Sequence, residues 1–190
     1  MPQFGALNSP CRAQSAKMDF AEQIEDRLGT CMSASENLIL LIEDNDDDRE
    51  LAILAFKQGP VATNLMALDD GKQALDYLFA DARFAPDAES GMPSLILLDL
   101  KMPKIDGLEV LRRVRADPRT RFVPVVILTS SMEQSDIIEA YRLGANSYLR
   151  KPVDFLDFVE TARQISRYWL TLNQALPADA IYRRGDGTST

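Results

Sequence analysis

One acidic side chain follows a short apolar run in the middle of the chain. Leu95–Leu98 is uninterrupted aliphatic sequence between Pro93 and Pro103, and Asp99 comes directly after it. A run this short and this apolar is typical of a strand that is buried on both faces of a sheet. Because open parallel α/β sheets bind ligands at the carboxyl ends of their strands, we expect Asp99 to face a functional crevice.

Three other apolar runs end in side chains that suit phosphoryl chemistry. Leu38–Ile42 leads into Glu43 and Asp44, Val125–Leu128 leads into Thr129, and Ser147–Leu149 comes shortly before Lys151. Three carboxylates at one edge repel one another unless a hard cation such as Mg²⁺ lies among them. A hydroxyl and an ammonium group can bind the other oxygens of a phosphoryl group. The pattern predicts Asp99 as the nucleophile, which would form an aspartyl phosphate.

The composition excludes several other chemistries. The 190-residue chain has no histidine, which rules out Ser-His-Asp and Cys-His catalysis and histidine-ligated zinc. A net charge of −8 argues against a nucleic-acid-binding surface. Cys11 and Cys31 both precede the first apolar run, and the sequence shows neither a signal peptide nor a membrane span. We therefore expect a cytoplasmic protein without nucleic-acid or membrane partners.

Apolar runs alternate with segments of helical periodicity from Asn37 onward. A further strand is predicted over Leu65–Leu68, and helices over 46–58, Gly71–Ala80, Leu108–Ala116, Ser135–Leu143 and Val153–Asn173. The first of these helices should turn Leu51, Leu54 and Ala55 inward. Five strand–helix units predict a doubly wound α/β fold, a flavodoxin-like (βα)5 domain with a five-stranded parallel sheet in the order 2-1-3-4-5.

The sequence divides into three parts. Residues 1–36 read as a disordered extension with a short amphipathic helix over Lys17–Leu28, residues 37–172 as the domain, and residues 173–190 as a C-terminal extension too short for an output domain. The last helix carries an apolar stripe beyond the expected core, formed by Ile165, Trp169, Leu172 and Leu176. These residues either fold back as core or form the seam of a homodimer.

Four motifs, taken in order, resemble the CheY-like receiver domain of two-component response regulators. They are LLIEDN (40–45), LLDLKMPKIDG (97–107), PVVILTSS (124–131) and GANSYLRKP (144–152), and the resemblance spans about Asn37 to Trp169. It implies that a histidine kinase phosphorylates Asp99, and that Thr129 and Lys151 bind the phosphoryl group. It also implies that Asp44 and Asp99 bind Mg²⁺ directly, Glu43 through water, and Lys101 through its backbone carbonyl. Tyr148 matches a switch position that rotates inward when Thr129 moves toward the phosphate.

The YWLTLNQ ending, the long connection 81–93 and the stretch DPRTRFVPVVILTSS look like stand-alone regulators paired with bacteriophytochrome-type kinases. The resemblance implies a single-domain phosphorelay regulator that signals by conformational change and protein contact, without turnover of a separate substrate. It also implies a homodimer through the fourth helix, fifth strand and fifth helix.

Two alternatives stay open at this point. One is a haloacid-dehalogenase-like phosphatase, although that family has a second aspartate where Lys101 stands. The other is a scaffold with a vestigial phosphorylation site. Two residues depart from the receiver pattern: Glu43 replaces the commoner aspartate, and Ser130 occupies a position often held by alanine.

Overall fold

A computed structural model describes residues 38–59, 61, 63–79 and 92–176 of the chain. The chain divides into two compact units, residues 1–33 and residues 34–190, and the fold below belongs to the second unit. The first unit lies outside the described residues, as does the helix predicted over Lys17–Leu28. Within the described ranges, no helix is long and apolar enough to cross a membrane. The predicted domain boundaries at residues 37 and 172 stay predictions.

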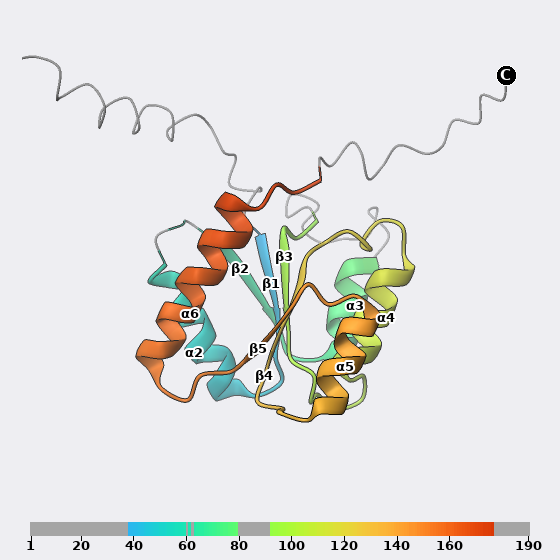
Figure 1. Cartoon of the computed structure of the whole chain (residues 1–190), viewed down its shortest axis with the longest axis horizontal. Helices are drawn as coiled ribbons and strands as arrows, with labels where there is room; N and C mark the ends of the chain where they lie inside the picture. The colour runs from blue at the N-terminus through green and yellow to red at the C-terminus, as the bar shows by residue number, and fades with distance from the viewer. Residues whose placement is uncertain (1–37, 60, 62, 80–91, 177–190) are drawn as a thin grey trace, which may run out of the picture. The chain divides into compact units, whose positions relative to one another are not determined.

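Five parallel strands of the described chain form one sheet, in the order β2-β1-β3-β4-β5 (Figure 1). The strands are β1 (Leu38–Ile42), β2 (Asn64–Leu68), β3 (Leu95–Leu98), β4 (Val125–Thr129) and β5 (Ser147–Arg150). The three central strands are buried along their whole length, whereas β2 and β5, at the edges, are partly exposed. The predicted fold class and strand order are therefore confirmed.

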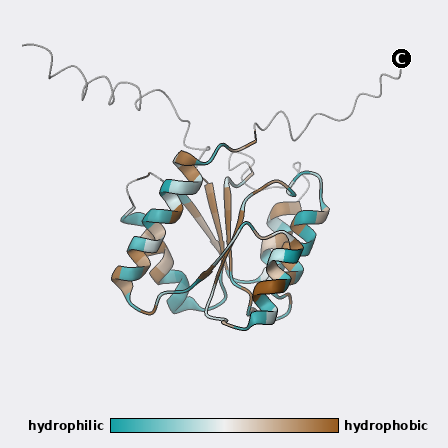
Figure 2. Ribbon diagram, in the orientation of Figure 1, coloured by the Kyte–Doolittle hydropathy of each residue, from teal (hydrophilic) through white to brown (hydrophobic). Residues whose placement is uncertain are grey.

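Helices cover both faces of the sheet. They are α2 (Asp46–Lys57), α3 (Gly71–Phe79), α4 (Gly107–Ala116), α5 (Gln134–Leu143) and α6 (Phe155–Arg167), and a π-helical segment, η1 (Tyr168–Leu172), follows α6. Helices α2 and α6 lie on one face and α3, α4 and α5 on the other (Figure 1). Because side chains alternate along a strand, Leu40 and Ile42 enter one core, and Ile39 and Leu41 the other. Figure 2 shows the central strands as apolar ribbons between helices that carry both hydrophilic and hydrophobic residues.

One prediction about a helix face was wrong, and one alternative that the sequence left open is decided. In α2 the buried stripe is Ala52, Ala55 and Phe56, while Leu54 is 43% exposed, because at 100° per residue it lies to one side of that stripe. In α6 Ile165 is only 5% exposed and packs in the core with Phe158 and Val159, so it cannot belong to a dimer seam.

The last helix also changes its hydrogen-bond pattern where a continuous α-helix was expected. The α-helical part ends at Arg167, and the amide of Asn173 donates to the carbonyl of Tyr168 at 2.7 Å, which closes a wider π turn. Inside this turn the rings of Tyr168 and Trp169 meet edge to face, with centroids 5.0 Å apart. Leu172 and Leu176 follow and are 59% and 50% exposed.

Candidate functional site

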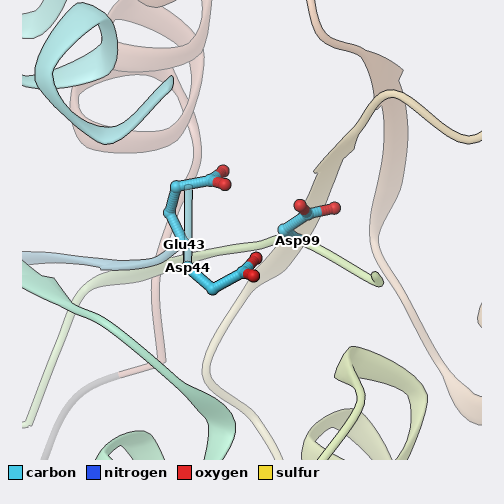
Figure 3. A group of neighbouring side chains, drawn as sticks. All are labelled: Glu43, Asp44 and Asp99. Atoms are coloured by element: carbon cyan, nitrogen blue, oxygen red, sulfur yellow. The ribbon is translucent and has the colours of Figure 1, made fainter. Parts of the chain in front are cut away.

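Three carboxylates gather where the two central strands β1 and β3 end. Glu43 and Asp44 follow β1, Asp99 follows β3, and an oxygen of each lies within 4.8 Å of the others (Figure 3). The register pairs Ile42 with Leu98, so the residues just beyond these partners must lie side by side. Glu43 and Asp99 are buried, and Asp44 is half-buried. A set of three hard oxygen donors at this spacing suits a divalent cation such as Mg²⁺.

The ammonium group of Lys151 lies among these carboxylates. Its Nζ is 2.6 Å from Oε2 of Glu43, 2.9 Å from Oδ2 of Asp99 and 2.9 Å from Oδ2 of Asp48. Asp48 was not among the predicted site residues. It stands in the first turn of α2, where its amide donates to the side chain of Asn45, the residue that caps the helix. That position, one turn beyond Asp44, is the sequence signal that could have identified it.

Burial and the neighbouring charges shift the pKa values of Glu43 and Lys151 in opposite directions. Burial raises the pKa of Glu43 to about 7, although the hydrogen bond from Lys151 works against the rise. For Lys151, burial by itself lowers the pKa, but the hydrogen bonds to Glu43 and Asp48 and the charge of Asp99 outweigh it and raise the pKa above its usual value. Lys151 is therefore a permanent cation at neutral pH.

The backbone around Asp99 fixes the direction of its carboxylate. Oδ1 accepts from the amides of Leu100 at 2.6 Å and Lys101 at 3.4 Å, which leaves Oδ2 to Lys151. The loop then closes tightly, since the amide of Gly107 donates to the carbonyl of Leu100 at 3.0 Å. A Cβ at Gly107 would lie 2.1 Å from the carbonyl oxygen of Asp99. Only glycine can begin α4 this close to the site.

Thr129 and Tyr148 approach the same residue, Ser131, from different strands. Thr129 is fully buried, and its Oγ1 accepts from the amide of Ser131 at 3.3 Å. The hydroxyl of Tyr148 donates to the carbonyl of Ser131 at 3.2 Å. The hydroxyl of Ser131 donates to Oδ2 of Asp136 at 2.7 Å. Ser131 and Asp136 were not predicted, because a serine in a loop and an aspartate in the first helical turn usually have local capping roles.

The structure thus brings most of the predicted strand-end residues into one cluster, and Thr129 lies beside it, where its backbone carbonyl accepts from the amide of Lys151 at 2.9 Å. Glu43, Asp44, Asp99 and Lys151 share one cluster, and Lys101 contributes its amide to Asp99. The Lys101 side chain turns away to pair with Asp136 at 2.7 Å. A carboxylate held by two amides and an ammonium, beside further carboxylates, can receive a phosphoryl group while nearby cations offset its charge.

Comparison with known proteins agrees with this geometry. Residues 39–163 match the family described as the response regulator receiver domain. The probable methanogenesis regulatory protein FilR2 of Methanothrix harundinacea is 41% identical over 138 residues, which cover 73% of this chain and 86% of FilR2. The response regulator Rcp1 of Synechocystis is 36% identical over 133 residues, covering 70% of this chain and 88% of Rcp1.

Solved structures of response regulators also resemble this chain. The Mn²⁺-bound form of Rcp1 has a TM-score of 0.66 at 34% identity and covers 74% of this chain and 99% of that one. The bacteriophytochrome response regulator RtBRR has a TM-score of 0.58 at 43% identity, and the match covers 77% of this chain and 89% of RtBRR.

The chain belongs to the response regulator receiver domain family. Proteins of this family take part in phosphorylation-based signalling with a histidine kinase as partner, and they bind a divalent metal ion. The phosphatase alternative therefore falls away, since that activity belongs to a different family.

Proposed function

We propose that this protein is a phosphorelay response regulator that accepts a phosphoryl group on Asp99 and signals through protein contacts. The observation that carries the proposal is the contact between Lys151 and Asp99, 2.9 Å long, beside the buried carboxylate of Glu43. One cation already lies against the oxygen of the acceptor, and the remaining acidic groups suit a second. We also propose that the protein acts in the cytoplasm and turns over no separate substrate.

The residues of the cluster divide the work of phosphoryl transfer. A carboxylate oxygen of Asp99 forms a bond to phosphorus as the bond between phosphorus and the donor breaks. Lys151 then binds a phosphoryl oxygen, and the hydroxyl of Thr129 donates to another. Thr129 can do so because its oxygen accepts from Ser131, which leaves its own proton free.

The metal proposed for this site is Mg²⁺. Glu43, Asp44 and Asp99 would hold it, together with the backbone carbonyl of Lys101. Mg²⁺ would supply positive charge that offsets the negative charge of the phosphoryl oxygens. The donor set supports this assignment because it consists of oxygens, which hard cations prefer to the nitrogen and sulfur ligands typical of zinc.

Thr129 and Tyr148 are proposed as the switch that reports phosphorylation. The two side chains meet at Ser131, one at its amide and the other at its carbonyl. A shift of Thr129 toward a phosphoryl group would therefore move the acceptor of the Tyr148 hydroxyl. The output surface is then the face formed by β5 and its neighbouring helices.

A homodimer through α5, β5 and α6 is proposed as the signalling form. Ile138 and Tyr141 of α5 are 43% and 51% exposed, and Leu172 and Leu176 add further exposed apolar surface after α6. Of the four predicted seam residues, Ile165 is excluded by its burial, and Trp169 packs partly against the core. Leu172 and Leu176 remain the seam residues of the proposal.

The kinase is proposed to be of the bacteriophytochrome type, supported by the likeness to RtBRR. The test is phosphotransfer from a panel of radiolabelled histidine kinases, with the label on this protein followed over time. We expect a bacteriophytochrome kinase to transfer its label faster than the other kinases. Equal rates across the panel would contradict the choice of kinase, and no transfer from any kinase would contradict the function.

A further inference from the structure

A chain of polar contacts links the loop after β3 to the loop after β4. Lys101 stands two residues beyond Asp99, and Ser131 stands two residues beyond Thr129. Both side chains meet on one oxygen of Asp136, which lies 2.7 Å from the Lys101 ammonium and 2.7 Å from the Ser131 hydroxyl. We call Lys101, Ser131 and Asp136 the clasp. Lys101 comes from the loop after β3, and Ser131 and Asp136 come from the loop after β4 and the first turn of α5, so the contact between Lys101 and Asp136 joins two segments that are distant in the sequence.

Asp136 is the central member of the clasp. Its side chain is 13% exposed, whereas that of Lys101 is 53% exposed, so the carboxylate is the more buried partner. The hydrogen bonds from Lys101 and Ser131 hold the pKa of Asp136 below its usual value. The carboxylate is therefore charged at neutral pH, and it can hold both donors at once.

Ser131 carries the effect of the clasp to both switch residues. Its amide donates to Thr129 and its carbonyl accepts from Tyr148, while its hydroxyl is held by Asp136. The amide of Glu133 also donates to the Ser131 hydroxyl, at 3.4 Å, which closes the turn into α5. Because the amide, carbonyl and hydroxyl of Ser131 are all engaged, a change at Asp136 is transmitted through Ser131 to both Thr129 and Tyr148.

We propose that Asp136 is a positioning residue that sets the lifetime of the phosphoryl group on Asp99. The inference rests on the proposed function. By holding Lys101 and Ser131, Asp136 closes the clasp across the space between the ends of β3 and β4. The closed clasp limits the approach of water to phosphorus and links Ser131, and through it Thr129, to the loop that follows Asp99.

The step that the clasp slows is hydrolysis of the aspartyl phosphate. The oxygen of a water molecule bonds to phosphorus, the bond between phosphorus and the Asp99 carboxylate oxygen breaks, and inorganic phosphate leaves with release of a proton. Asp99 returns to its ionised form. Asp136 touches none of the reacting atoms and acts only through Lys101 and Ser131.

The test measures the first-order loss of phosphate after acetyl phosphate is removed. The variants are Asp136→Asn, Lys101→Met and the double variant, each in the full chain with Mg²⁺ present. Glu139→Gln is the matched control, because it removes a carboxylate one turn further along α5. Asp136→Glu tests rescue by a side chain that keeps the carboxylate, and thermal unfolding of each unphosphorylated variant reports any general loss of structure.

We expect each single substitution to shorten the lifetime about fivefold and the double variant to match the singles, because all of them break the same link. The Asp136→Glu variant should retain most of the lifetime, and the Glu139→Gln variant should retain all of it. Unchanged lifetimes, a longer lifetime in Asp136→Asn, or effects that multiply in the double variant would overturn the clasp. Failure of the unsubstituted protein to take up phosphate would instead overturn the proposed function.

Discussion

The ammonium nitrogen of Lys151 lies 2.9 Å from Oδ2 of Asp99, although 52 positions separate the two residues in the sequence. The contact joins the end of β3 to the loop after β5 across the intervening strand β4. Both side chains are more than nine-tenths buried. A phosphoryl group on Asp99 must therefore redistribute an existing ion pair, and the same lysine can follow the charge from carboxylate to phosphoryl oxygen.

Removal of that ammonium should destabilise the fold unless another cation replaces it. We expect Lys151→Met to lower the free energy of unfolding by about 3 kcal/mol without Mg²⁺, because it leaves buried carboxylates unpaired. Added Mg²⁺ should recover part of the loss. Urea unfolding with and without Mg²⁺ measures both effects.

The matched control for this substitution is Lys104→Met. Lys104 also pairs with an aspartate, Asp70, at 2.8 Å, but its side chain is 68% exposed. Asp70 is buried, but water can replace the exposed ammonium and the amide of Gln73 still donates to the carboxylate at 2.8 Å, so we expect this pair to contribute less than about 1 kcal/mol. If the two variants lost equal amounts of unfolding free energy, the result would contradict the expectation that the buried Lys151 contributes more stability than Lys104.

The closure of the loop under Asp99 depends on Gly107. A methyl group there meets the Asp99 carbonyl at 2.1 Å, which is backbone and cannot swing aside. We expect Gly107→Ala to cost about 3 kcal/mol of stability and to reduce phosphorylation of Asp99, since the loop must shift. The comparison is Gly59→Ala, where the added carbon would lie 3.1 Å from the Phe56 carbonyl oxygen. Chemical unfolding should rank Gly107→Ala as the more damaging change, and the reverse order would argue against the tight loop.

Much of this site follows from the pattern of apolar runs. Leu38–Ile42, Leu95–Leu98 and Val125–Leu128 are short, uniformly apolar and alternate with helical segments, which favours central strands of a parallel sheet, and parallel strands end at a common edge. The residues after them, Glu43 and Asp99 among them, therefore had to meet. The edge strand β5 was also predictable, because the glycine that ends α5 sets its start.

The contacts between side chains were not predictable in the same way. Asp48 and Asp136 both lie in first helical turns, where an acidic residue has a sufficient local role beside the helix N-terminus. Their partners, Lys151 and Lys101, come from distant segments, and no periodicity marks such a meeting. The burial of Ile165 likewise depends on how α6 packs against α2, since the helical stripe alone is equally compatible with core and interface.

Mg²⁺ affinity should depend on Asp44 far more than on the exposed aspartate Asp47 in the first turn of α2. We expect Asp44→Asn to weaken Mg²⁺ binding about tenfold or more, because it removes the negative charge of one of the three carboxylates in the cluster. Asp47→Asn removes the same charge from an exposed position in the first turn of α2 and should leave the affinity nearly unchanged. Isothermal titration calorimetry of both variants distinguishes binding at a specific site from attraction of Mg²⁺ by the overall negative charge. Equal weakening would indicate that net charge alone attracts the ion.

The proposed dimer can be tested with the exposed leucines after α6. We expect Leu172→Ser combined with Leu176→Ser to convert a dimer to a monomer, because these side chains are at least half exposed and contribute little to the fold of one subunit. Sedimentation velocity gives the mass directly. Leu54→Ser, at an exposed leucine on α2, is the control and should leave the dimer intact. An unchanged mass in the double variant would contradict a dimer interface at Leu172 and Leu176.

The phosphoacceptor itself is tested most directly by intact-mass measurement after incubation with acetyl phosphate and Mg²⁺. The protein should gain one phosphoryl group, and the Asp99→Asn variant, shown by unfolding to be folded, should gain none. This result would also exclude a vestigial site. A gain that persists in Asp99→Asn, or no gain in the unsubstituted protein, would contradict the assignment of Asp99.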